Sequence, residues 1–196
     1  MPANIKDTLE GLMEFHYPRY DELPEALVFL EAIVKQVNDS HAPIPFEMRR
    51  NGKLFTSSMA SNYIKQGLTP PPVGKKYTRD HICLIYFASM MKLVFSTDNV
   101  LALTNRLFTE DNVAAVNDAL ADTFEQSIRC YARFGLAAIA GIDEPPVSRG
   151  IELGQGEGPW RDLEPGAAML VSFVADAFAS KAVSVAMLGE GPVEAQ

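Results

Sequence analysis

Apolar residues recur every three or four positions along several stretches of the chain, which is the spacing of amphipathic helices. The first stretch predicts a helix over residues 25–38, which would open the ordered part of the chain. Pro24 suits the first turn of this helix, where the N–H that proline lacks would have no partner in any case. The apolar face consists of Leu27, Leu30, Ile33, Val34 and Val37.

A short polar helix is predicted further along the chain, in the stretch TSSMASNYIKQG. Thr56 or Ser57 caps its first turn, because a side-chain oxygen there can accept a hydrogen bond from a free backbone N–H. The helix runs to about residue 66, and Gly67 is placed to end it in the left-handed conformation that glycine adopts readily. Upstream of it, the pair Asn51-Gly52 is typical of a hairpin turn.

Three consecutive prolines follow this helix, and they exclude a helix or a central strand because each one removes a backbone donor. The sequence KKY at residues 75–77 predicts a short strand. Thr78 then caps a helix over residues 79–95, whose segment ICLIYFASMMKLVF is apolar nearly all round. A helix with apolar residues on every face is usually buried at the centre of a domain.

Three more helices are predicted, over residues 98–108, 110–135 and 166–188, with a loop rich in Gly, Pro and acidic residues before the last. The last helix is strongly apolar, but Asp176 and Lys181 interrupt it, so we expect a buried helix and not a membrane span. The last two helices carry more apolar surface than a lone helix pair can hide. They are expected to pack on the first half, form a dimer interface or line a small-molecule pocket.

Composition narrows the class of protein. The chain has 196 residues, of which 47% are hydrophobic and 21% charged, so it can bury a full core. Its net charge of −8 argues against a protein that coats nucleic acid non-specifically. The first residues lack the basic and then apolar pattern of a secretion signal, and Cys83 and Cys130 make no disulfide framework. We therefore expect a cytoplasmic protein with reduced thiols.

The charge is unevenly distributed along the chain. Residues 49–92 contain eight basic side chains and one acid, a net charge of +7, whereas the rest of the chain carries −15. On the short polar helix, four polar residues spaced i, i+3, i+4 and i+7 share one face. They are Ser58, Ser61, Asn62 and Lys65, and the strand and the next helix add Lys75, Lys76 and Arg79. Cations beside a short polar helix are typical of modules that contact a nucleic-acid backbone, although an ordinary solvated helix has the same composition.

The order of these parts resembles the winged helix-turn-helix of the mercury-resistance-regulator (MerR-like) superfamily. There, a recognition helix ends in a Tyr-containing run before Gly-Leu and leads through a proline into a wing, and a Tyr before Ser or Thr begins the next helix. The corresponding residues here are Tyr63, Gly67, Leu68, Pro70, Tyr77 and Thr78. More closely, residues 17–107, from YPRYDELP past the segment MKLVFS, resemble a bacterial family of uncharacterised domains with a MerR-like DNA-binding region.

The resemblance implies DNA binding by Ser58, Ser61, Asn62, Lys65, Lys75, Lys76 and Arg79. It implies no ligand, cofactor or reaction. The chain departs from the superfamily pattern in three places. Ser61 and Asn62 stand where the superfamily commonly has Arg and Tyr, and the wing is shorter than usual. The candidate first helix of the motif ends near Asn38 and so does not lie immediately upstream. No long charged heptad for a coiled-coil dimer follows. We therefore expect recognition to depend on phosphates more than on bidentate contacts between arginine and guanine.

Other chemistry finds little support in the sequence. His16, His41 and His81 are far apart, and none has Cys or carboxylates at the spacing of metal ligands, so no metal site is expected. His81 is expected to pack against or cap the start of its helix. The glycines of GIELGQGEGPW lack the strand-to-helix context of a phosphate loop. No set of residues points to an enzyme or to a cofactor.

We therefore expect a mainly α protein, with a MerR-like winged helix-turn-helix of short wing in residues 1–108 and helices for dimerisation or effector binding in residues 109–196. The predicted function is a cytoplasmic transcriptional regulator that binds double-stranded DNA as a homodimer, without a membrane, and responds to an unknown effector. The alternative is a protein–protein interaction module on a winged-helix scaffold that has lost DNA readout. The negative net charge and the missing arginine support this alternative.

Overall fold

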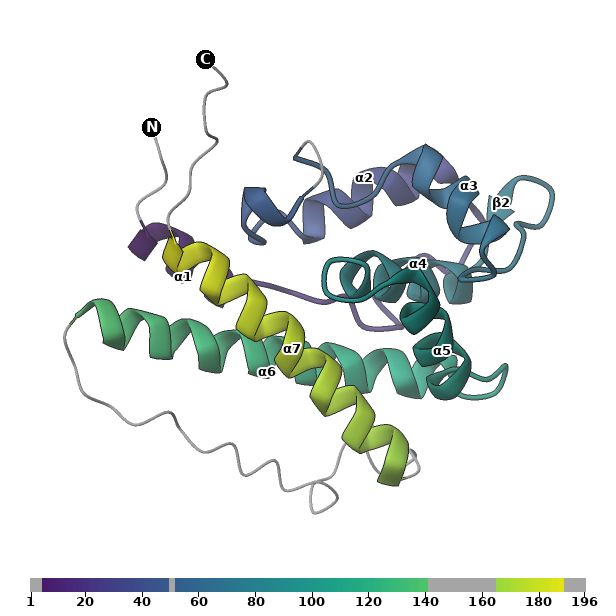
Figure 1. Cartoon of the computed structure of the whole chain (residues 1–196). Coiled ribbons are helices and arrows are strands. Elements are labelled where there is room, and N and C mark those ends of the chain that lie inside the picture. The colour runs from purple at the N-terminus through teal and green to yellow at the C-terminus, as the bar shows by residue number, and fades with distance from the viewer. Residues whose placement is uncertain (1–4, 50–51, 141–164, 189–196) are drawn as a thin grey trace.

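The chain folds mainly into helices joined by loops, as the hydrophobic spacing predicts (Figure 1). The computed structural model describes residues 5–49, 52–140 and 165–188, so the hairpin residue Asn51 and nearly all of the predicted acidic loop lie outside the described residues. The helices are α1 (Ile5–Met13), α2 (Leu30–Ser40), α3 (Ser57–Lys65), α4 (Arg79–Met91), α5 (Thr97–Leu107), α6 (Val113–Ile139) and α7 (Pro165–Leu188). A 3-10 turn covers Phe46–Met48, and β1 (Val28–Phe29) pairs with β2 (Lys76–Tyr77) in an antiparallel sheet.

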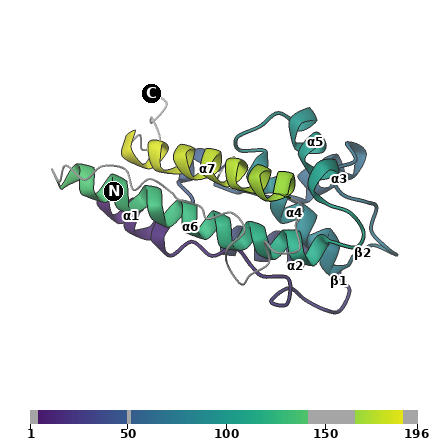
Figure 2. The same ribbon diagram turned by 90° about the horizontal axis from the view of Figure 1, so that it is seen from below.

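Helices α6 and α7 run side by side, and α1 packs against both (Figures 1 and 2). Helix α1 was not predicted, because its two buried residues, Leu9 and Leu12, are too few to show a period. A glycine allows the close approach of α1 and α6, since a Cβ atom on Gly135 would lie only 3.1 Å from the Leu9 side chain. Helix α1 therefore packs with α6 and α7, although it lies at the other end of the sequence. The predicted division of the chain into two regions at residue 108 stays a prediction.

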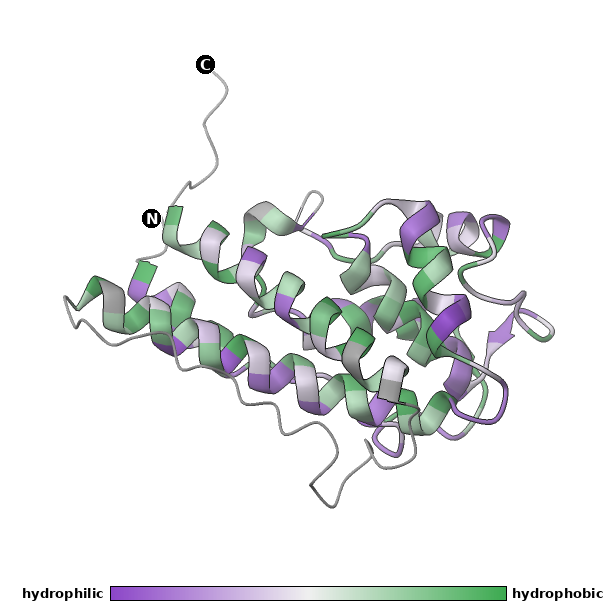
Figure 3. Ribbon diagram, turned by 60° about the horizontal axis from the view of Figure 1, so that its bottom comes forward, coloured by the Kyte–Doolittle hydropathy of each residue, from purple (hydrophilic) through white to green (hydrophobic). Residues whose placement is uncertain are grey.

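Helix α7 is apolar along most of its length (Figure 3). In the described part of the chain, Gly166–Leu188 is the one stretch that has the length and composition to cross a membrane. Of its most apolar window, 53% is buried inside the protein. Val171, Phe178 and Ala182 are among the buried residues, so α7 contributes one whole side to the core.

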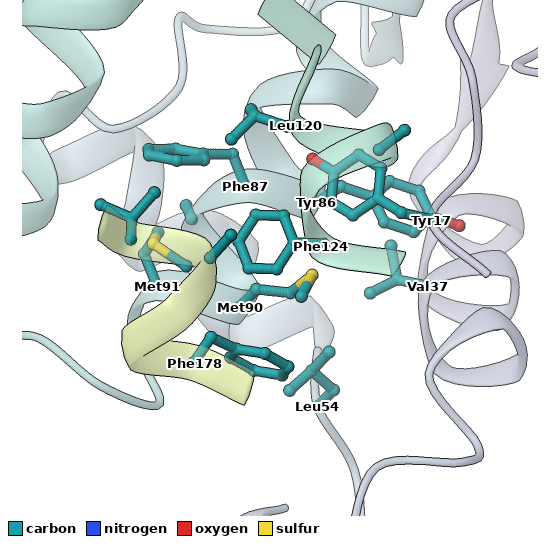
Figure 4. Close-up of a cluster of buried hydrophobic side chains, with 14 of the residues drawn as sticks. Tyr17, Val37, Leu54, Tyr86, Phe87, Met90, Met91, Leu120, Phe124 and Phe178 are labelled. Carbon is teal, nitrogen blue, oxygen red and sulfur yellow. The ribbon is translucent and has the colours of Figure 1, made fainter. Parts of the chain in front are cut away.

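Helix α4 lies at the centre of the molecule, as its apolar sequence predicts. Ten of its thirteen residues are buried. Helices α3, α5, α6 and α7 all contact it. Figure 4 shows Met90 of α4 packed with Phe124 of α6 and Phe178 of α7. The helix ends at Met91 and not near Phe95, because the chain tightens into turns there before α5.

The start of the first predicted helix was wrong, since α2 begins at Leu30 and not at residue 25. The two residues before Leu30 form β1 instead, in which Val28 lies opposite Tyr77 of β2. This confirms the strand predicted at KKY. Its partner was missed because the pairing joins segments that are distant in the sequence, and two residues inside an apolar helical pattern give no separate strand signal.

One side chain closes the long connection between α2 and α3. Nδ2 of Asn38 donates to the carbonyl oxygens of Val34 at 2.7 Å and of Phe55 at 2.8 Å. Its Oδ1 accepts from the backbone N–H groups of Leu54 at 2.8 Å and Phe55 at 3.2 Å. Both donors and both acceptor positions of the amide are therefore used. The end of α2 is fixed to the residues that lead into α3.

Buried aromatic rings link the segments around α4. Tyr17 stacks on Phe124 with 5.7 Å between ring centroids and lies 5.9 Å from Tyr86. His41 lies 5.2 Å from the same Tyr86 ring and donates from Nδ1 to the carbonyl of Val37 at 2.7 Å. Burial lowers the pKa of His41 to about 4, so at neutral pH the imidazole is an uncharged part of the core.

This buried histidine predicts a loss of stability in weak acid. The unfolded chain takes up a proton at His41 as the pH falls below about 6.5, whereas the folded chain resists protonation down to about pH 4. Stability contributed by the neutral ring is therefore full above pH 6.5 and falls by about 2 kcal/mol between pH 7 and pH 5.

Urea unfolding at pH 7 and pH 5 measures this loss. The free energy of unfolding is expected to differ less between pH 7 and pH 5 in His41→Leu than in the wild type. This holds whatever the substitution does to stability at pH 7. An equal pH dependence in the wild type and the variant would show that other groups cause the loss.

Candidate nucleic-acid interface

The polar face of α3 is exposed to solvent, as its spacing predicts. The exposed residues of this face are Ser58, Ser61, Asn62 and Lys65. Ala60 and Tyr63 on the opposite side are buried. The Ser61 hydroxyl donates weakly to the carbonyl of Ser57 at 3.4 Å, whereas the side chains of Asn62 and Lys65 have no hydrogen bond or ion pair within the described ranges.

Caps at both ends hold α3 in place. Thr56 Oγ1 accepts from the N–H of Met59 at 3.3 Å, which confirms Thr56 as the N-cap. Gly67 has a φ of +75° and ends the helix, and the N–H of Leu68 then donates to the carbonyl of Tyr63 at 2.9 Å. Tyr63 anchors the helix beneath, with its ring 5.8 Å from Phe55, and burial raises the pKa of its hydroxyl to about 12.

A tight hairpin follows the prolines. Val73 and Lys76 exchange two backbone hydrogen bonds, from Val73 N–H at 2.9 Å and from Lys76 N–H at 3.0 Å. The two residues between them have positive φ angles, +55° for Gly74 and +69° for Lys75, which is the pattern of a type I′ turn. Glycine adopts this conformation readily, but for a lysine it is strained. Among described residues other than glycine, Lys75 alone has a positive φ.

The hairpin and α3 lie at the same end of the molecule (Figure 1). Lys75 is exposed at the tip of the turn. Lys76 is half-buried, and its Nζ lies over the ring of Phe29 in β1, 5.1 Å from the centroid. The exposed face of α3 together with Lys75 and Lys76 is called the basic end below.

Arg79 has a different environment from the lysines. Its guanidinium lies over the ring of Tyr20, 5.0 Å from the centroid. The Tyr20 hydroxyl donates to Oδ1 of Asp80 at 2.7 Å. The backbone N–H of Tyr20 donates to Oδ1 of Asp118 in α6, also at 2.7 Å. Burial, and then the hydrogen bond to Asp80, raises the pKa of Tyr20 to about 12. The structure thus places Arg79 against an internal partner and only partly in solvent.

His81 caps the start of α4, as predicted. The Thr78 hydroxyl accepts from the N–H of His81 at 3.4 Å, and Nδ1 of His81 accepts from the N–H of Thr78 at 3.2 Å. Nε2 of the same ring donates to the carbonyl of Pro71 at 3.2 Å. The His81 ring therefore joins the base of the hairpin to the first turn of α4.

The lysines of the basic end are free to meet an external anion. Within the described residues, Lys65, Lys75 and Lys76 form no ion pair with a carboxylate. The longest-range ion pair among the described residues lies elsewhere, between the loop after α1 and the buried Glu125 of α6. There, Glu125 pairs with Arg19 at 3.6 Å, and its Oε1 also lies 2.9 Å from Nδ1 of His16.

Two aromatic residues that contact the predicted site were missed from the sequence. Phe29 and Tyr20 each lie under a cation, at positions that no local pattern relates to residues 76 and 79. The sequence pointed to Tyr20 only because the YPRY segment is part of the resemblance to the family of uncharacterised domains. In the part of the chain that the structure describes, no group of three His, Cys, Asp or Glu residues could hold a metal ion.

Comparison with known proteins identifies a family. A family model described as "Domain of unknown function (DUF1836)" matches residues 18–132, more than half of the chain. This range includes β1, α3, the hairpin and α4, so it contains the whole basic end. No curated protein and no solved structure matches the chain. The predicted likeness to a family of uncharacterised domains is confirmed, and its MerR-like character stays a prediction.

The strained turn predicts that Lys75→Gly stabilises the protein. Glycine relieves the left-handed strain at this position, and its extra flexibility in the unfolded chain offsets only part of the gain. We expect the free energy of unfolding, from urea titration, to rise by about 0.5–1 kcal/mol. Lys76→Gly is the matched control, because Lys76 has extended backbone in β2 and this change is expected to destabilise. A loss of stability in both variants would mean that the turn is not strained at Lys75.

Proposed function

Since the chain belongs to the DUF1836 family, whose description carries no function, we propose from its geometry that it is a cytoplasmic transcriptional regulator that binds double-stranded DNA. The basic end acts as a MerR-like winged helix-turn-helix. In this proposal α2 and α3 are the two helices of the motif, α3 enters the major groove, and the hairpin is the wing.

The order of elements supports this proposal. Strand β1 precedes α2, and β2 of the hairpin pairs with β1, so the wing is attached to the helix pair. The connection between α2 and α3 is longer than a short turn, but Asn38 closes it with three hydrogen bonds to Leu54 and Phe55. The side-chain amide of Asn38 therefore holds the two helices together, as a tight turn would.

The observation that carries the proposal is the conformation of Lys75. A lysine in a left-handed turn costs stability that a glycine would not, and its exposed ammonium makes no ion pair within the described residues. Strain retained at an exposed cation is typical of a functional contact. A phosphate is the anion that a projecting wing lysine would meet on a duplex.

Recognition by α3 is expected to be modest in sequence specificity. Ser58, Ser61 and Asn62 are short side chains that let the helix approach base edges, and Asn62 can pair with adenine. Lys65 and the wing lysines add phosphate contacts, which position the protein without reading sequence. Arg79 contributes less than the lysines, because its guanidinium already stacks on Tyr20.

We propose that the protein acts as a homodimer through α6 and α7. Duplex readers commonly match the two-fold symmetry of their sites. Phe173 of α7 is 64% exposed, and Phe134 and Ile139 of α6 and Leu188 of α7 are exposed as well. Large apolar side chains on neighbouring helices, which the described residues leave uncovered, support an interface with a second copy.

A second candidate function rests on a separate observation. Leu27, Phe29 and Val73 are all exposed beside the hairpin, and Val73 is 60% exposed. Exposed apolar residues with a polar surround are typical of protein–protein contact sites. The alternative is therefore a protein-interaction module that uses the same end of the molecule without reading DNA.

The DNA proposal predicts salt-dependent binding that the lysines control. Binding of the purified protein to the DNA upstream of its own gene, and to a scrambled duplex, is measured by fluorescence anisotropy across a salt series. Replacing both Lys75 and Lys76 with Ala is expected to weaken binding to both duplexes alike and to reduce the slope of log K against log salt by about 2. Lys65→Ala is expected to reduce it by about 1.

Lys6→Ala is the matched control, because Lys6 lies on α1, away from the basic end (Figure 1). It should leave affinity and slope unchanged. The absence of binding at low salt would overturn the DNA proposal and favour the protein-interaction module. Unchanged affinity in the hairpin variant, with binding intact, would instead place the DNA on another surface.

A further inference from the structure

A groove beside the base of the hairpin has the chemistry of a ligand site. It lies where the end of α3, the start of α4, the end of α5 and the start of α6 meet, and it has a volume of about 570 Å³. This is within the range of pockets that take small organic molecules. We propose that the groove binds a small organic cation, an amine with an apolar body.

The apolar part of the site comes from three elements. Leu84 of α4, Phe108 after α5 and Val113 of α6 line the groove. Phe108 is held in place by an edge-to-face contact with the buried Phe87, with 5.2 Å between ring centroids. A fixed aromatic ring at the wall suits both an apolar body and an ammonium group near its face.

The charged part of the site is acidic. Asp80 and Glu110 line the groove, together with neutral polar groups such as Asn105, and no Lys or Arg of the described residues is among the lining residues. Glu110 is exposed and forms no ion pair within the described ranges. Tyr20 engages only Oδ1 of Asp80. Two carboxylates without a lining cation favour a positively charged ligand.

The other groups that face the groove do not reverse this preference. Both ring nitrogens of His81 already have partners inside the protein, Nδ1 at Thr78 and Nε2 at the carbonyl of Pro71. The N-termini of α4 and α6 bring about half a positive charge each, and the C-terminus of α5 brings about half a negative charge. The two negative charges of the carboxylates are larger than the net partial charge of these three helix ends.

Amine binding here does not depend on DNA binding, since the groove and the basic end have no lining residue in common. A bound molecule would nevertheless touch both the first turn of α4, which carries the hairpin, and the connection from α5 to α6. The groove is therefore placed where occupancy can alter the hairpin relative to the last helices.

Three matched probes test the proposal on the full chain by isothermal titration calorimetry. 4-Phenylbutylamine, 4-phenylbutanol and 4-phenylbutyrate share one apolar body and differ in the charge of the head group. We expect the amine to bind at least about tenfold more tightly than the carboxylate, with the alcohol between them. Amide chemical-shift changes for Leu84, Phe108 and Val113 should locate the bound amine.

Variants separate charge recognition from simple apolar binding. Glu110→Gln and Asp80→Asn should each weaken amine binding by about fivefold and leave the alcohol unaffected. Asp98→Asn is the control, because Asp98 is exposed on α5 and does not line the groove. Should Asp80→Asn fail to fold, Glu110→Gln alone decides, since Glu110 is an exposed loop residue. Equal affinity for all three probes, no binding at millimolar concentration, or wild-type binding by Glu110→Gln would overturn the proposal.

Discussion

The burial of α4 on nearly all sides, with ten of its thirteen residues buried, is the constraint on which the rest of the structure depends. A helix without a polar face is stable only if other elements cover it completely, and α3, α5, α6, α7 and β2 supply that cover. These elements come from the whole length of the chain, so one set of buried side chains extends from Leu9 to Ala186. The exposed hairpin and α3 are consequently mounted on the best-packed element of the protein.

The first turn of α4 also joins the exposed end of the molecule to its interior. Asp80 binds the hydroxyl of Tyr20, and the backbone of Tyr20 binds Asp118 of α6. Further along α6, the buried carboxylate of Glu125 meets Arg19 and Arg129. The loop after α1 therefore acts as a strap between α4 and α6, and hydrogen bonds to charged groups of this kind each contribute about 1.5–3 kcal/mol. A tilt of α6 relative to the hairpin has to break them.

The sequence predicted the features that act over one helical turn. Thr56, Gly67 and Thr78 set helix ends through their own backbone or side-chain bonds; Gly67 and Thr78 were identified correctly, and Thr56 was one of the two candidates for its cap. The polar face of α3 also followed from spacing alone. Strand β1, helix α1 and the stacking of Arg79 on Tyr20 could not be predicted, because each depends on a partner far away in the sequence. The residues of the candidate site could therefore be predicted from the sequence, but the contacts that these residues make in the fold could not.

The three hydrogen bonds from Asn38 to Leu54 and Phe55 have a consequence for how this chain can vary. They fix the distance between the end of α2 and the start of α3 at the two ends of a loop, so the length of the loop between those ends does not set the angle of the helices. Doubling the length of a flexible loop adds only about 0.6 kcal/mol of closure entropy. The exposed part of this loop can thus lengthen at little thermodynamic cost, whereas Gly52 itself has to remain a glycine, because its φ is +73° and a Cβ atom there would lie 2.8 Å from the Phe46 ring.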